Sequence, residues 1–278
     1  MRTTKIVADS SANLLKLDIT PFASAPLKVI TEGREFVDDE TLNVEEMVSY
    51  FDSYKGRSQT SCPNPADWLT AFGDTDDVFC VTITSGLSGS YNAAIAAKQM
   101  YESENPGKRV HVIDSLSAGP ELALIVERLQ ELITQGLDYE EICNQIQAYT
   151  QKTGLLFMLE SMRNLAANGR VSPAVAKIAG LLGIRVVGKA SNAGTLEPLD
   201  KCRGENKALE KIVSRLQDLG LQEGKVRIAH CQNLVAAEKL KKLIAEQLPK
   251  AQTEISQCTG LCSYYAEKGG LLVAFEKQ

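Results

Sequence analysis

Histidine is scarce in this sequence. The 278 residues include only two histidines, His111 and His230, far apart along the chain. A His-rich metal site and a typical Ser-His-Asp triad therefore have little material to draw on. We expect His230, at the end of a predicted strand, to be structural rather than catalytic.

An excess of positive charge is also missing. The chain has 30 basic and 35 acidic residues, for a net charge of −5. Because phosphate backbones are recognised by clustered Lys and Arg, we expect no nucleic-acid partner. Lys177 and Arg185 interrupt the best apolar stretch, residues 174–188, which predicts a soluble protein without stable membrane insertion. The N-terminal residues lack the apolar core of a secretory signal, which predicts a cytoplasmic location.

Paired cysteines and metal-binding spacings are lacking as well. Seven cysteines, an odd number, are scattered from Cys62 to Cys262, so we expect reduced thiols rather than a disulfide framework. Cys258 and Cys262 have no companion Cys or His pair at zinc spacing. We therefore expect no metal and no cofactor.

The first half of the chain repeats one pattern: a short apolar run, a Ser/Thr/Gly cluster and a helical periodicity. The runs are residues 5–8, 78–84 and 109–113, and helical patterns are clearest at 122–133 and 139–150. Strands alternating with helices predict βαβ units on a mostly parallel sheet. We place this α/β domain at residues 1–153.

The second half mixes hairpin and crossover signals. Ser172 and Pro173 predict a helix to about Leu182, and residues 191–194 predict a turn between strands 184–188 and 195–199. Predicted helices follow at 205–219 and 234–247, and predicted strands at 226–230, 253–256 and 271–275. This favours a second, α+β domain at residues 154–278, with the boundary near Lys152-Thr153-Gly154.

The stretch Ser85-Gly86-Leu87-Ser88-Gly89-Ser90 is a candidate anion site. It lies between a predicted strand and a helix, so its amides and hydroxyls converge where the helix dipole favours a negative charge. Ser88 is the best-placed hydroxyl donor, but it could equally be a helix cap. The stretch fits neither a phosphate-binding loop nor a nucleophile elbow.

Other hydroxyls and an arginine are candidate ligands. Thr60 and Ser61 precede a helix predicted to begin after Asn64, and they could bind the same anion as Ser88 or only satisfy nearby backbone. Neutral donors suit a carboxylate better than a phosphate, which usually recruits Lys or Arg. Arg170 follows a glycine turn and is either a surface residue or a forked donor to a ligand or partner.

Charge is unevenly distributed, with a basic excess at residues 201–250. The simpler interpretation is a set of solvated helix faces. The alternative is a docking surface for an acidic protein partner.

Eight short motifs, taken in order, are specific as a set and span nearly the whole chain. They are residues 6–14, 25–29, 36–38, 60–65, 83–91, 112–115, 168–172 and 201–204. In these motifs the chain resembles the DegV family of bacterial fatty-acid-binding proteins, which includes binding subunits of the fatty acid kinase system.

The resemblance implies a two-domain fold with an acyl chain between an α/β and an α+β domain. It implies that Thr60 and Ser88 hold the fatty-acid carboxylate, and that Arg170 lies near the pocket mouth and serves the partner. Where the family commonly has Gly-Thr-His-Thr-Gly-Pro-Gly, this chain has a different sequence at residues 263–269. The histidine position falls on Tyr265, or on Tyr264 if the alignment slips by one, and a phenol carries no charge at neutral pH.

We therefore expect a non-catalytic carrier of a long-chain fatty acid such as palmitate, with a fatty acid kinase subunit as a possible partner. The expected ligand-binding residues are Thr60, Ser61, Ser88, Arg170 and Tyr265. One alternative is an enzyme or regulatory protein that acts on a small phosphorylated or keto metabolite. Another is a protein that docks through the basic 201–250 face.

Overall fold

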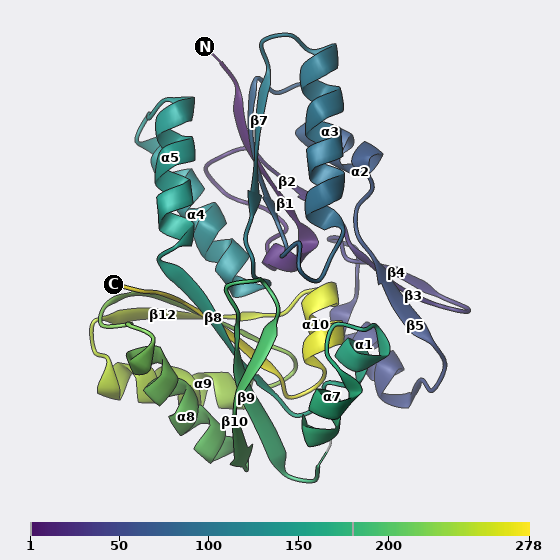
Figure 1. Cartoon of the computed structure of the whole chain (residues 1–278), viewed down its shortest axis with the longest axis vertical. Helices are drawn as coiled ribbons and strands as arrows, with labels where there is room; N and C mark the ends of the chain where they lie inside the picture. Colours follow the sequence, from purple (N-terminus) through teal and green to yellow (C-terminus); the bar gives the residue numbers. More distant parts are fainter. Residues whose placement is uncertain (1, 180) are drawn as a thin grey trace.

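The computed structural model describes residues 2–179 and 181–278, which form two large sheets with helices around them (Figure 1). The first large sheet has the order β2-β1-β6-β7, and every neighbouring pair is parallel. The predicted parallel α/β arrangement is confirmed. Its strands are β1 (Thr4–Asp9), β2 (Phe22–Ala25), β6 (Asp77–Thr82) and β7 (Arg109–Asp114).

Successive residues of this sheet face two different helical layers. Ile6 and Phe79 pack with α4 and α5, whereas Val7 and Val78 pack with α2 and α3. Both faces are covered, so the strands are continuous apolar runs rather than alternating ones. Figure 1 shows the two helical layers on opposite sides of the sheet. The helices are α2 (Pro65–Phe72), α3 (Ser90–Glu104), α4 (Pro120–Thr134) and α5 (Tyr139–Thr150).

A small antiparallel sheet, β4-β3-β5, was not predicted from the sequence. Its strands are three or four residues long, and β5 consists of Ser, Gln, Thr and Ser, so it has no apolar alternation to reveal it. The strands are β3 (Lys28–Thr31), β4 (Glu35–Val37) and β5 (Ser58–Ser61), and α1 (Val44–Ser53) connects the last two.

The second large sheet has the order β10-β9-β8-β13-β11-β12. It is antiparallel except for the β11/β12 pair, and the β9–β10 hairpin forms as predicted. This mixture confirms the predicted α+β class. Its strands are β8 (Thr153–Leu159), β9 (Ile184–Ala190), β10 (Leu196–Arg203), β11 (Gly224–His230), β12 (Ala251–Gln257) and β13 (Leu271–Glu276).

Two long helices, α8 (Glu205–Asp218) and α9 (Leu234–Gln247), pack their apolar faces on this sheet. Three short helices lie elsewhere: α6 (Arg163–Ala167), α7 (Pro173–Ala179) and α10 (Gly260–Ala266). The predicted extension of α7 to about Leu182 is wrong, because Leu181 and Leu182 are non-helical and Gly183, with φ of 73°, turns the chain into β9. Gly180 lies outside the described residues.

Helix α4 connects the two large sheets. Its Glu127 accepts hydrogen bonds from Arg227 of β11 at 2.7 and 2.8 Å, and its Glu131 pairs with Lys225. Part of the basic excess at residues 201–250 is therefore neutralised within the molecule. The chain changes from one sheet to the other between Thr150 and Thr153, and the predicted division at 153/154 stays a prediction.

Candidate functional site

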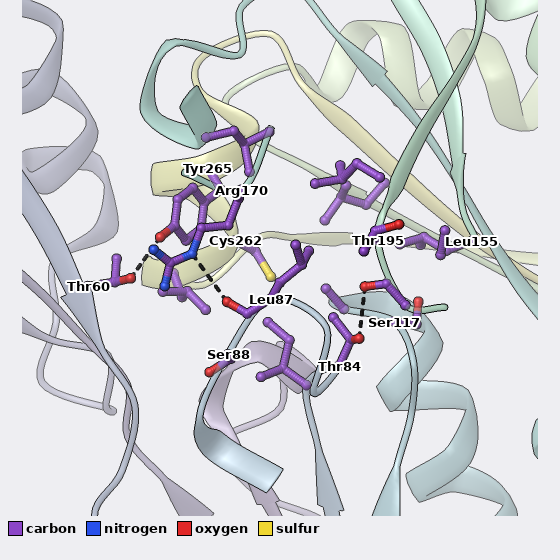
Figure 2. Close-up of a pocket in the computed structure, with 18 of the residues that line it drawn as sticks. Thr60, Thr84, Leu87, Ser88, Ser117, Leu155, Arg170, Thr195, Cys262 and Tyr265 are labelled. Atoms are coloured by element: carbon purple, nitrogen blue, oxygen red, sulfur yellow. Dashed lines mark hydrogen bonds between the residues drawn. The ribbon is translucent and has the colours of Figure 1, made fainter. Parts of the chain in front are cut away.

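An apolar cavity of about 300 Å³ lies between the first and second large sheets (Figure 2). This volume is at the lower end of the ~300–1,000 Å³ typical of small-molecule sites. Arg170 is its one charged side chain among the described residues that line it. Most of the wall is aliphatic or aromatic, including Leu27, Ile83, Leu87, Leu155, Phe157, Leu159, Leu165, Leu196, Leu261 and Leu272.

All five predicted ligand-binding residues line this cavity. They come from four separate parts of the fold: strand β5, the loop before α3, the loop after α6, and helix α10. Residues up to 205 positions apart in the sequence thus face one space. The five are Thr60, Ser61, Ser88, Arg170 and Tyr265.

Two consecutive tyrosines of α10 hold strand β5. The Tyr265 hydroxyl lies 2.7 Å from the Thr60 hydroxyl, and the Tyr264 hydroxyl lies 2.7 Å from that of Ser58. Thr60 and Ser58 are two residues apart, so their side chains share one face of the strand. Burial raises the pKa of the Tyr265 phenol, which therefore remains a neutral hydrogen-bonding group.

Arg170 lies at one end of the cavity and is held by backbone carbonyls. Its Nε donates to the Leu87 carbonyl at 3.2 Å, as Figure 2 shows, and its Nη1 donates to the Asn168 carbonyl. Gly169, with φ of 73°, provides the predicted turn before it. The two bonds use two of the five N–H groups of the guanidinium, which leaves donors for a ligand.

Ser88 fits both interpretations made from the sequence, a partner of the helix end and a hydroxyl donor to a ligand. Helix α3 begins at Ser90, with Gly89 as N-cap and no side-chain cap. The Ser90 amide donates to Ser88 Oγ at 3.3 Å, while Ser88 also lines the cavity. The hydroxyl therefore keeps its own proton for a ligand at a helix end where the dipole favours an anion.

Asp9 holds the loop before α3 in place through hydrogen bonds. The sequence did not identify it as a site residue. Its side chain is fully buried and accepts from Ser90 Oγ at 2.6 Å and from the Ile83 amide at 2.8 Å. Burial raises its pKa, whereas hydrogen bonds from Ser11 and Ser90 oppose the shift. The sequence did offer a signal for this role, because Asp9 is an acidic residue at the end of a buried apolar strand and directly before Ser10-Ser11.

Asp38 fixes the N-terminus of α10. Its carboxylate accepts from the amides of Gly260 at 2.6 Å and Leu261 at 2.9 Å. Burial raises the pKa of Asp38 to about 6. The sequence alone does not identify this role of Asp38, because the partner amides lie more than two hundred positions away.

The β9–β10 hairpin closes another side of the cavity. Thr84 Oγ1 donates to the Gly194 carbonyl at 2.8 Å (Figure 2). Gly194 has φ of 70°, and a Cβ there would lie 1.9 Å from Thr84 Oγ1. Only glycine allows the hairpin tip to approach this closely.

The histidine and cysteine side chains that could act in catalysis lie in surroundings typical of structural residues. His230 is buried, and its Nδ1 accepts from the Asn233 amide at 3.3 Å. Burial raises the pKa of the cavity thiols Cys62 and Cys262, which makes them poor nucleophiles.

Within residues 2–179 and 181–278, no group of three or more His, Cys, Asp or Glu side chains could hold a metal ion. No helix in the same ranges is long and apolar enough to cross a bilayer.

The fold and site define a class of two-sheet α/β proteins with an apolar ligand cavity between the sheets. The chain belongs to the DegV family: the family model described as "Uncharacterised protein, DegV family" matches residues 3–278. A DegV domain-containing protein of Streptococcus pneumoniae is 43% identical over 278 residues, covering 99% of each chain.

Solved structures of relatives agree closely with this fold. A DegV family protein from Eubacterium eligens, loaded with heptadecanoic acid, has 44% identity and a TM-score of 0.97, covering 99% of this chain and 100% of its own. The Streptococcus pneumoniae Fatty Acid Kinase (Fak) B3 protein, loaded with linoleic acid, has 42% identity and the same TM-score of 0.97, with 99% and 100% coverage.

Proposed function

We propose that this protein binds one long-chain fatty acid, such as palmitate, with its tail in the cavity and its carboxylate at Thr60 and Ser88. Ser61, Arg170 and Tyr265 complete the headgroup site. The observation that carries the proposal is the composition of the cavity: an apolar wall with hydroxyls and, among its described lining residues, one charged side chain, Arg170. The fatty acids held by the two structural relatives support it.

The tail and the headgroup contribute differently to binding. Each buried methylene contributes about 0.8 kcal/mol, so a long tail supplies most of the affinity. Neutral hydroxyls with one arginine match a singly charged carboxylate, because a phosphate usually recruits several cations. The headgroup residues therefore set the orientation of the acid.

The biological role we propose is a cytoplasmic carrier that transports the acid and presents it to a fatty acid kinase subunit. The name of the Streptococcus pneumoniae relative supports the kinase link, and seven free cysteines suit a reducing compartment. The protein itself acts as a binding subunit rather than a catalyst and needs no cofactor beyond the bound acid. An enzyme acting on a small metabolite is disfavoured, because the described cavity wall has no carboxylate or histidine for acid–base catalysis.

The test is direct binding to delipidated protein. We expect saturable palmitate binding by calorimetry and an acyl lipid in native mass spectra of the protein before delipidation. Absence of both would refute the proposal.

A further inference from the structure

Helix α10 connects three of the residues proposed for the headgroup site. Its Tyr265 hydroxyl lies 2.7 Å from the hydroxyl of Thr60 (Figure 2). Its Tyr264 hydroxyl accepts from Asn168 Nδ2 at 2.9 Å, and the Asn168 carbonyl accepts from Arg170. The placement of α10 therefore affects where Tyr265 and its two partners face a bound carboxylate.

The helix that carries these tyrosines is too short to hold its own place. It has seven residues, and a helix of this length is unstable without packing. Its N-cap, Thr259, makes no side-chain cap bond, so the first amides need another acceptor. Asp38 provides that acceptor, because its carboxylate accepts from the amides of Gly260 at 2.6 Å and Leu261 at 2.9 Å.

The contact between Asp38 and α10 is closely fitted. A Cβ on Gly260 would lie 2.8 Å from Asp38 Oδ1 and 2.4 Å from Leu42 Cδ2. Glycine at this position therefore lets the helix backbone approach the carboxylate. The next residue, Leu261, lines the apolar cavity, so this contact also fixes the start of a cavity wall.

Asp38 is itself fixed from the other side. It is buried, and its own amide donates to the Leu27 carbonyl at 2.9 Å. The Leu27 amide donates in turn to Ser10 Oγ at 3.0 Å, and Thr259 Oγ1 donates to the Ser10 carbonyl at 3.1 Å. Asp38 thus joins α10 to the backbone that follows β1 and precedes β3.

We propose that Asp38 is a positioning residue of the carboxylate site. It holds α10 in the place from which Tyr265 orients Thr60. From the same helix, Tyr264 holds the turn before Arg170. This inference rests on the proposed function. Asp38 is not among the described residues that line the cavity, so it acts on a bound acid through α10.

The headgroup and the tail of a ligand should respond differently when this contact is lost. Much of the apolar wall comes from other elements, such as β8 with Leu155 and Phe157. An alcohol with the same chain length uses that wall but carries no carboxylate. Loss of the Asp38 contact should therefore weaken binding of the acid more than binding of the alcohol.

The experiment titrates delipidated protein with palmitate and with hexadecanol. The pH is about 8, above the Asp38 pKa of about 6, so that its carboxylate is ionised. Asp38→Asn keeps one acceptor oxygen for α10 and replaces the other with an NH₂ group. We expect palmitate binding to weaken by about threefold to tenfold and hexadecanol binding by less than about twofold.

Glu121→Gln is the matched control. Glu121 is also a buried carboxylate in the first turn of a helix, α4, and it accepts from Thr153 Oγ1 at 2.7 Å. Neither residue is among the described residues that line the cavity. The control variant should leave the affinity for both ligands unchanged.

A double-mutant cycle tests the path through Tyr265. Tyr265→Phe removes the hydroxyl that Asp38 is proposed to place. The loss of palmitate affinity in the Asp38→Asn/Tyr265→Phe protein should therefore be at least about twofold smaller than the product of the two single losses. Glu121→Gln combined with Tyr265→Phe should bind palmitate as weakly as Tyr265→Phe alone.

The outcomes separate this inference from the proposed function. If palmitate fails to bind wild-type protein, the proposed function is wrong and this inference fails with it. If wild-type protein binds palmitate but Asp38→Asn weakens acid and alcohol equally, or if the two single losses multiply, Asp38 only supports the fold and the inference is overturned. If Asp38→Asn does not fold, Asp38→Glu takes its place. It keeps both acceptor oxygens but adds a methylene that displaces α10, and an equal effect on acid and alcohol would overturn the inference in the same way.

Discussion

The hydroxyls of Thr60 and Tyr265 lie 2.7 Å apart and join two residues separated by 205 positions in the sequence. This contact joins two walls of the cavity, because Thr60 belongs to β5 and Tyr265 to α10. Arg170 lines the same space and opposes the rise in the Tyr265 pKa. The neutral phenol of Tyr265 thus orients the neutral hydroxyl of Thr60 in the cavity that Arg170 also lines.

Removing the Tyr265 hydroxyl should weaken headgroup binding without unfolding the protein. The Tyr265→Phe variant loses one hydrogen bond of about 1 kcal/mol, so palmitate affinity should fall roughly fivefold. The measurement is calorimetric titration of delipidated protein. Tyr149→Phe removes a phenol that bonds Glu276 away from the cavity and is the matched control; equal losses in both variants would contradict the proposed role.

Ser88→Ala tests whether Ser88 is a ligand donor or only a partner of the helix end. A hydrogen bond to a carboxylate contributes about 1.5–3 kcal/mol, so palmitate affinity should fall about tenfold or more. Binding of hexadecanol, which has no carboxylate, should change little. Ser85→Ala, in the same loop but exposed and outside the cavity wall, should affect neither ligand. Equal weakening of acid and alcohol by Ser88→Ala would make Ser88 a plain cap.

Gly194→Ala should loosen the hairpin that closes the cavity. The added Cβ would lie 1.9 Å from Thr84 Oγ1 and 3.2 Å from the Leu116 Cα, in a backbone conformation with φ of 70°. Gly136→Ala is the control, because Gly136 has φ of 75° with nothing within 4 Å of its Cβ position. The control should cost about 1–2 kcal/mol of unfolding free energy from backbone strain alone.

We expect Gly194→Ala to cost clearly more than the control in urea denaturation and to release bound lipid faster in stopped-flow displacement. The reason is that the hairpin must move away from Thr84 to accommodate the methyl group. Similar costs and release rates for the two variants would show that the hairpin contact does not retain the ligand.

Asp38 should make stability depend on pH in the weakly acidic range. Its pKa is raised from 3.8 to about 6 by burial, so the folded state holds a proton that the unfolded state has released. The contribution of Asp38 to the free energy of unfolding is therefore largest below pH 4 and is lost as pH rises to about 6. A shift of this size corresponds to about 3 kcal/mol.

The Asp38→Asn variant lacks this titration. Relative to wild type, the variant should therefore become more stable as pH rises, with its free energy of unfolding gaining about 3 kcal/mol on the wild-type value between pH 3 and pH 7. Asp9 and Glu121, whose pKa values are also raised, are present in both proteins, so the difference isolates Asp38. Parallel pH profiles in urea denaturation would contradict the assignment.

The large elements were predictable because each carries its own local signal. Helix α5 coincides with the predicted 139–150, and α9 with the predicted 234–247, because apolar periodicity and capping act within one segment. Strands β3, β4 and β5 lacked such a local signal. They are short, partly polar and paired across the chain, so only their partners define them.

The sequence by itself determined which side chains were available for a site: few histidines, no cationic excess, and hydroxyl clusters at the ends of buried strands. Those features follow from residue types and short-range order. The tertiary structure decided which hydroxyls meet, that Tyr265 contacts Thr60, that Asp38 and Asp9 support the walls, and that Arg170 lines the same cavity. These relationships join residues far apart in the chain, and only the packing of separate elements, such as α10 against β5, brings those residues together.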